Sequence, residues 1–372
     1  ACAAERGHTM SINEFIVYLM VVFMALGAVD RILGNRFGLG EKFEEGIMAM
    51  GSLALAMIGI ICLAPVLANL LRPVVVPLYQ ALGADPAMFA GTLLANDMGG
   101  APLAQELALT QEAGQFGGLI VGSMLGPTIV FTIPVGLGII KAEDRPYLAT
   151  GVLAGVITIP IGSFAGGLAA GFPVGMVLRN LIPIALFAVL IALGLAFLPN
   201  GMVKGFQVFG RIIVIIITIG LAAAIIQKLT PLTLIPGMDP ISEGVAIVGD
   251  IAVVLAGAFP LVYVITRIFK TPLMKLGHVL GMNDIAAAGL VATLANNIPM
   301  FQMLHDMDRR GKIINVAFAV SAAFVFGDHL GFTAGFDSTM IFPMIVGKLV
   351  GGVTAVAVAM LITRKYKEER HG

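Results

Sequence analysis

Two short polar stretches interrupt long apolar runs, and they are the residues of this chain best suited to bind a ligand. The first tip is Asn96-Asp97, and the second tip is Asn296-Asn297. Amide and carboxylate groups are costly in hydrocarbon unless protein or a water-filled cavity surrounds them. We therefore predict that both tips line a binding site inside a membrane protein.

Asp97 adds a negative charge to the first tip. A half-helix that ended there would present free carbonyl groups and the negative end of its dipole, which favours a bound cation. The alternative is that Asp97 only caps a returning half-helix near Gly99. The three asparagines carry donors and acceptors, so each could bind a hydroxyl or amine group or hold unwound backbone.

Four further ionisable residues lie deep in apolar runs: Asp250, Asp328, His329 and Lys348. Asp328 and Lys348 lie at similar depths, so they could form a structural ion pair, or Asp328 could contact the substrate directly. His329 could relay a proton or only hydrogen-bond to its neighbours. Asp250 could bind an ion or serve packing.

The composition is that of a polytopic helical membrane protein. Of the 372 residues, 58% are hydrophobic and 12% are charged, whereas about 25% are charged in soluble domains. Apolar runs of about 20 residues, long enough to cross a bilayer, recur along the chain. The net charge of zero gives no reason to expect a nucleic-acid partner. We recognise no metal cluster or cofactor motif and expect neither.

Reading apolar runs between helix breakers gives eleven segments. They are 12–33, 46–71, 87–107, 115–140, 147–171, 174–199, 204–228, 241–268, 286–305, 313–336 and 338–363.

Two of these segments, 87–107 and 286–305, contain the tips. A proline follows each tip, as at the first turn of a new helix. Basic clusters flank 286–305 on both sides, so a full crossing would put one cluster on the wrong side of the membrane. We therefore predict two re-entrant hairpins, nine full crossings, an outside N-terminus and a cytoplasmic C-terminus.

The two halves of the chain resemble each other at a spacing near 198 residues. Glu45-Gly46 matches Glu243-Gly244, and after a short gap Ala95-Asn96 matches Ala295-Asn296. The predicted fold is all-α, with two inverted repeats that each run span, span, re-entrant hairpin, span, span. An elevator-like motion and a homodimer are expected by analogy alone.

The predicted parts of the chain follow from this repeat. They are 1–9 as an extension or tag remnant, 10–172 as the first repeat, 173–200 as a linking transmembrane helix, 201–364 as the second repeat and 365–372 as a cytoplasmic tail.

These features favour a transporter over other membrane proteins. An enzyme would need a metal cluster or a nucleophile with its base, and neither is recognisable. A channel would place rings of polar residues along a pore rather than isolated groups at two tips. A receptor stays open as a further alternative.

The residues around both tips resemble the bacterial ethanolamine-utilisation transporter family, EutH. The segments that carry the resemblance are Phe43–Gly46, Phe89–Gly100, Gly122–Phe131, Ala292–Phe301 and Phe326–Phe332. The similarity extends from about Ser11 to Arg364. It implies a bacterial inner-membrane protein, not an enzyme, that takes up ethanolamine.

Ethanolamine fits the polar residues because it is a small cation with one hydroxyl group. The residues expected to bind it are Asp97, Asn96, Asn296, Asn297, Thr128 and Asp328. Those expected to form a coupling or structural polar network are His329, Lys348 and Asp250. Ion-coupled transport of another small amine or polar metabolite is the alternative.

Overall fold

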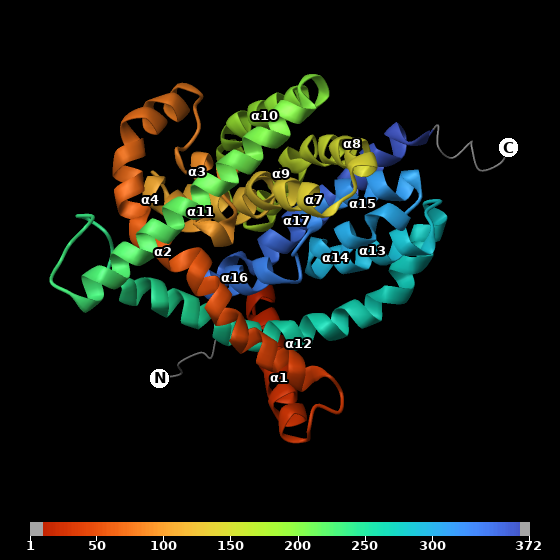
Figure 1. Ribbon diagram of the computed structural model, residues 1–372, viewed down its shortest axis with the longest axis horizontal. Coiled ribbons are helices and arrows are strands. Elements are labelled where there is room, and N and C mark those ends of the chain that lie inside the picture. The colour runs from red at the N-terminus through yellow and green to blue at the C-terminus, as the bar shows by residue number, and fades with distance from the viewer. Residues whose placement is uncertain (1–9, 365–372) are drawn as a thin grey trace, which may run out of the picture.

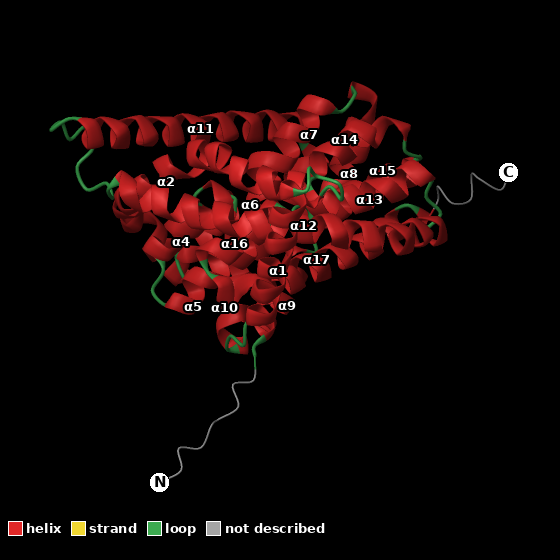
Figure 2. Cartoon of the chain, turned by 90° about the horizontal axis from the view of Figure 1, so that it is seen from below, coloured by secondary structure: helices red, strands yellow, loops and turns green. Residues whose placement is uncertain are grey.

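The computed structural model describes residues 10–364, and every regular element within that range is helical (Figure 2). The first half contains α1 (Ile12–Ile32), α2 (Leu39–Ala81), α3 (Ala87–Leu93), α4 (Gly100–Leu107), α5 (Gln111–Gln115), α6 (Leu125–Pro127), α7 (Ile133–Ile139), α8 (Arg145–Val156) and α9 (Ile159–Ala169). After α10 (Val174–Phe197) come α11 (Pro199–Leu229), α12 (Ile241–Val279), α13 (Asp284–Ala295), α14 (Asn297–Met303), α15 (Arg309–Ala322), α16 (Asp328–Phe336) and α17 (Ile341–Ile362). The predicted parts 1–9 and 365–372 lie outside the described residues.

The helices confirm a multi-pass membrane protein. Within the described residues, 8 helical stretches are long and apolar enough to cross a bilayer. They correspond to eight of the nine predicted crossings. Figure 2 shows α11 along one edge of the molecule.

Two helices are much longer than a bilayer is thick. α2 has 43 residues and α12 has 39, so at about 1.5 Å per residue each extends for roughly 60 Å. Prolines lie inside both helices, at Pro65, Pro73 and Pro77 in α2 and at Pro260 and Pro272 in α12. Figure 1 shows both helices as bent ribbons, and they pack against each other.

The predicted crossing 313–336 is wrong as a single helix, because 323–327 separates α15 from α16. Phe324 has a φ of 64°, which no right-handed helix contains. The N–H groups of Phe324 and Phe326 instead donate to the carbonyls of Thr293 and Leu294, at 3.2 and 2.9 Å. The end of α13 therefore supplies the hydrogen bonds that a continuous helix would have made itself.

The two ends of the segment that carries the first tip are tied together. The Asp85 carboxylate accepts from the N–H of Ala87 at 2.9 Å and from the N–H of Leu109 at 3.1 Å. Ala87 begins α3, and Leu109 follows α4. Burial raises the pKa of the Asp85 carboxyl above its ordinary value, and these hydrogen bonds offset part of that increase. The segment thus starts and ends at one place.

An equivalent tie closes the segment that carries the second tip. The N–H of Asn283, just before α13, donates to the Asp308 carboxylate at 2.7 Å. The Asn283 side chain donates to the carbonyl of Asp306 at 3.0 Å. Asp85 and Asn283 are separated by the repeat spacing of 198 residues. Both broken segments are therefore hairpins with joined feet.

Candidate functional site

The first tip is an unwound stretch between two short helices. Leu94 and Ala95 have extended backbone, and η1 (Asn96–Met98) forms a single 3₁₀ turn. Gly99 has a φ of 93°, a left-handed conformation that glycine adopts without strain, and α4 begins immediately after it. Asn96 is fully buried, whereas the Asp97 side chain keeps 20% of its surface exposed.

Asp97 does not cap the returning helix. The N-cap of α4 is Gly99, and no side chain accepts a hydrogen bond there. The Asp97 carboxylate lies 4.0 Å from Nε2 of His329 instead. The structure thus excludes a capping role for Asp97 at α4, and a contact with a ligand stays a prediction.

His329 stands between Asp97 and a buried lysine. Nζ of Lys348 lies 3.0 Å from Nδ1 of His329 and donates to the backbone carbonyl of Ser123. Of the two alternatives for Asp328, the ion pair with Lys348 does not form within residues 10–364, and contact with the substrate stays a prediction. The lysine ammonium is satisfied by a carbonyl and an imidazole, which leaves Asp328 to other partners.

The second tip opens onto a cavity of about 320 Å³. Asn296 has extended backbone between α13 and α14, and its side-chain oxygen accepts from the N–H of Ile298 at 2.8 Å. It also lines the cavity together with Asp328. The other lining residues are Lys42, Glu45, Phe259, Val262, Tyr263, Thr266, Ala295, Phe326 and Gly327. Carboxylates beside aromatic rings are the surroundings that a small ammonium group prefers.

Asn297 is buried and bound across the two halves. Its side-chain nitrogen donates to the Thr132 hydroxyl at 3.1 Å. Thr128, predicted to bind substrate, donates its hydroxyl to the carbonyls of Met124 and Val320, at 2.8 and 3.2 Å. Both residues are fully buried. The Thr128 hydroxyl is bound by protein, whereas the side-chain oxygen of Asn297 has no partner within residues 10–364.

The structure brings the predicted site residues together in separate groups. The turn that holds Asp97 packs against α16, which carries His329, whereas Asn296 and Asp328 share the cavity. Asp250 lies apart, on an exposed face of α12. Glu45 and Tyr263 were missed as cavity residues. Glu45 carried a usable signal, because it belongs to the repeated Glu-Gly pair.

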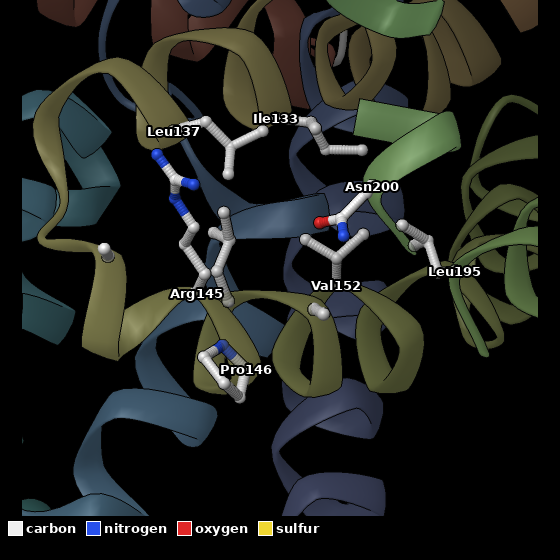
Figure 3. Close-up of a pocket in the computed structure, with 10 residues that line it drawn as sticks. Ile133, Leu137, Arg145, Pro146, Val152, Leu195 and Asn200 are labelled. Carbon is white, nitrogen blue, oxygen red and sulfur yellow. The ribbon is translucent and has the colours of Figure 1, made fainter. Parts of the chain in front are cut away.

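A larger cavity of about 400 Å³ lies elsewhere, between α7, α8, α10 and α11 (Figure 3). Its lining is mainly aliphatic, and Arg145 and Asn200 are its polar members. None of the predicted site residues reaches it. A pocket with a cationic side chain and no carboxylate does not suit an ammonium ligand.

Comparison with known proteins now decides the family. The family described as ethanolamine utilisation protein, EutH, matches residues 12–362. The chain belongs to the EutH family. It is 72% identical over 356 residues to a probable ethanolamine permease of Listeria monocytogenes, covering 96% of this chain and 95% of that protein.

More distant EutH relatives match over the same extent. A probable ethanolamine permease of Escherichia coli is 55% identical over 394 residues, covering 96% of this chain and 97% of that protein. An uncharacterised protein of Bacillus subtilis is 52% identical over 354 residues, covering 95% of this chain and 96% of that protein. No solved structure matches the chain.

Proposed function

We propose that this EutH protein takes up ethanolamine across the bacterial inner membrane, through a site between the two hairpin tips. The observation that carries the proposal is the 72% identity, over nearly the whole chain, to a probable ethanolamine permease. Membership of a permease family also favours transport over an enzymatic function.

The chemistry of the two tips supports a small hydroxylated ammonium as the substrate. Asp97 and Asp328 supply carboxylates for the ammonium group, and the asparagine amides supply donors and acceptors for the hydroxyl. With their ordinary charges, the two carboxylates and Lys348 sum to one negative charge when His329 is neutral. One bound ammonium would balance that charge. The balance lowers the free-energy cost of burying the negative charge away from water.

The hairpin feet support re-entry into the membrane. A segment whose ends meet at Asp85, or at Asn283 in the second half, cannot also connect opposite faces of a bilayer. With both segments re-entrant, the basic loops fall on one side and the two halves become inverted. The proposed topology places the C-terminus in the cytoplasm. An elevator-like motion and a homodimer stay predictions by analogy.

Uptake of labelled ethanolamine by cells that express matched amounts of protein tests the site. Asp97→Asn should lower uptake at least about tenfold, because a charge-assisted contact is lost. Asn296→Ala should lower it less. Glu112→Gln, on the exposed surface of α5, is the matched control and should transport normally. Wild-type uptake by both tip variants would rule out the proposed site.

Proteoliposomes test transport itself and its driving force. The purified protein should accumulate labelled ethanolamine under an imposed gradient of pH, sodium or voltage, and the effective gradient identifies the coupling. Absence of uptake under all three gradients would favour a receptor or an enzyme instead.

A further inference from the structure

The two halves show matching local geometry around the tips at a spacing of 201 residues. The hydroxyls of Thr92 and Thr293 each donate back to their own helices, to Met88 at 2.6 Å and to Gly289 at 2.9 Å. A Cβ atom added at Gly126 or Gly327 would collide with the carbonyl oxygen of Leu94 or Ala295, so neither position has room for a side chain. This register pairs Asn96 with Asn297, one position away from the match read from sequence.

The same register pairs Thr132 with Thr333. In one couple the Asn297 side chain donates to the Thr132 hydroxyl at 3.1 Å. That bond joins a tip of the second half to a helix of the first. The equivalent couple, Asn96 with Thr333, would join the tip of the first half to α16 of the second, and η1 does pack against α16.

This second couple is not hydrogen-bonded. Both side chains are fully buried, yet both side-chain atoms of Asn96 and the hydroxyl of Thr333 have no partner among residues 10–364. Buried polar groups in proteins are nearly always satisfied. In the first couple only the side-chain oxygen of Asn297 is unpaired among those residues, because its nitrogen and the Thr132 hydroxyl bind each other. In the second couple all three side-chain polar atoms are unpaired, so this couple has more atoms suited to another molecule.

The neighbours of the second couple indicate which molecule. Asp97 follows Asn96 directly, and its carboxylate faces His329. His329 and Thr333 are four residues apart on α16, so they share a helix face. The element with the Asp97 carboxylate and the unpaired Asn96 amide therefore packs against the element with the unpaired Thr333 hydroxyl. This set complements a primary ammonium and a hydroxyl joined by a short carbon chain.

We propose that Asn96 and Thr333 bind the hydroxyl group of the substrate, while Asp97 binds its ammonium group. Thr333 thereby becomes a specificity-determining residue that selects amino alcohols over simple amines. The inference rests on the proposed function, because it concerns the same site. In the other half, Thr132 and Asn297 bind each other in place of a substrate.

Binding of labelled ethanolamine to the purified full chain in detergent tests this assignment. Thr333→Val, which replaces the hydroxyl by a methyl group, should weaken binding about five- to tenfold, the loss of one hydrogen bond. Thr333→Ser keeps the hydroxyl and should bind within about twofold of wild type. Thr354→Val is the matched control, because that hydroxyl bonds to Val350 and Gly351 within α17, and its binding should not change.

Thermal unfolding without ethanolamine separates a binding role from a structural one. Thr333→Val removes an unpaired buried hydroxyl, so its melting temperature should equal or exceed that of wild type. Thr132→Val leaves Asn297 unpaired and should melt at a lower temperature.

Three results would overturn the assignment of Thr333. They are wild-type ethanolamine affinity in Thr333→Val, an equal loss of affinity in Thr333→Val and Thr132→Val, or a melting temperature of Thr333→Val well below wild type. A wild-type protein that binds no ethanolamine would instead refute the proposed function itself.

Discussion

Buried charges in this protein are of two kinds. Asp97 and Lys348 approach His329 from either side but do not touch each other. Lys312, by contrast, donates directly to Asp144, which His305 also contacts at 3.1 Å. The Asp144 side chain is only 2% exposed. The first arrangement leaves a carboxylate open to a ligand, whereas the second is closed and structural.

Removing Asp144 should therefore destabilise the protein strongly. In Asp144→Ala the Lys312 ammonium stays buried without its carboxylate, and we expect a loss of about 3–5 kcal/mol. Thermal unfolding of the purified variant measures this loss. Lys42→Met is the control, because Lys42 and Glu45 form a pair with 35% and 55% of their side chains exposed, worth at most about 1 kcal/mol. Equal losses in the two variants would contradict the distinction.

At the scale of single residues, the positions of the two tips could be predicted from the sequence, but the partner of Lys348 could not. The breaks at Asn96-Asp97 and Asn296-Asn297 were predictable, because polar groups inside an apolar run are costly unless protein or water surrounds them. The partner of Lys348 was not predictable. A backbone carbonyl, here that of Ser123, carries no sequence signal, so the similar depths of Lys348 and Asp328 suggested an ion pair that does not form.

Among the elements, the hairpins depend on the ties at their feet. Asp85 joins the start of α3 to the residues after α4, and Asn283 does the same for α13 and α14. Each tie joins the two arms of its hairpin at their feet. The hairpins were predictable from charge placement and prolines, but the ties were not, because each links residues more than 20 positions apart.

Loss of a tie should loosen its hairpin. Asp85→Ala removes the bonds from Ala87 and Leu109, and we expect a loss of about 1–3 kcal/mol. Asn283→Ala removes the side-chain bonds to Asp306 and Ala286 but keeps the backbone bond to Asp308, so its loss should lie at the lower end of that range. Amide hydrogen exchange should increase in α3 and α4 for the first variant and in α13 and α14 for the second. Unchanged exchange in both hairpins would show that the ties do not hold them.

Two glycines, Gly126 and Gly327, allow the chain to pass close to the backbone of the two broken segments. A Cβ atom at Gly126 would lie 1.9 Å from the Leu94 carbonyl oxygen, and one at Gly327 would lie 2.1 Å from that of Ala295. Gly126→Ala and Gly327→Ala should each lower the free energy of unfolding by about 3 kcal/mol, the upper end of the usual cost of overpacking. Gly138→Ala is the control, because nothing lies within 4 Å of its added Cβ. Melting temperatures near that of wild type for all three would contradict this close approach.

The contact of residues 324–327 with the end of α13 explains why the predicted single helix 313–336 is wrong. The segment 313–336 looks like an unbroken apolar helix, since neither proline nor a polar tip interrupts it before Gly327. The break at Phe324 arises because its N–H finds the Thr293 carbonyl on a different helix. A tertiary partner about 30 residues away outweighs the local preference for a helix.

For the whole molecule, the hydrophobic pattern was sufficient to predict the class. Between residues 10 and 364, eight long apolar helical stretches lie where crossings were expected. The proposed orientation can be tested with single cysteines in a chain without its two natural ones. A cysteine at Leu234, in the exposed loop before α12, should react with a membrane-impermeant maleimide on intact cells. One at exposed Glu143 should react only after permeabilisation. The opposite pattern would invert the orientation.

The length of α2 and α12 has a physical consequence for the lipid around them. Helices of roughly 60 Å cannot stand upright in a hydrocarbon layer of about 30 Å without exposing apolar turns to water. Tilting, bending and local changes in bilayer thickness absorb such a hydrophobic mismatch, and each has an elastic cost. The elastic energy of the surrounding bilayer then contributes to the free energy of each conformation of the protein. Its turnover should depend on acyl-chain length in reconstituted bilayers, even where every protein contact is unchanged.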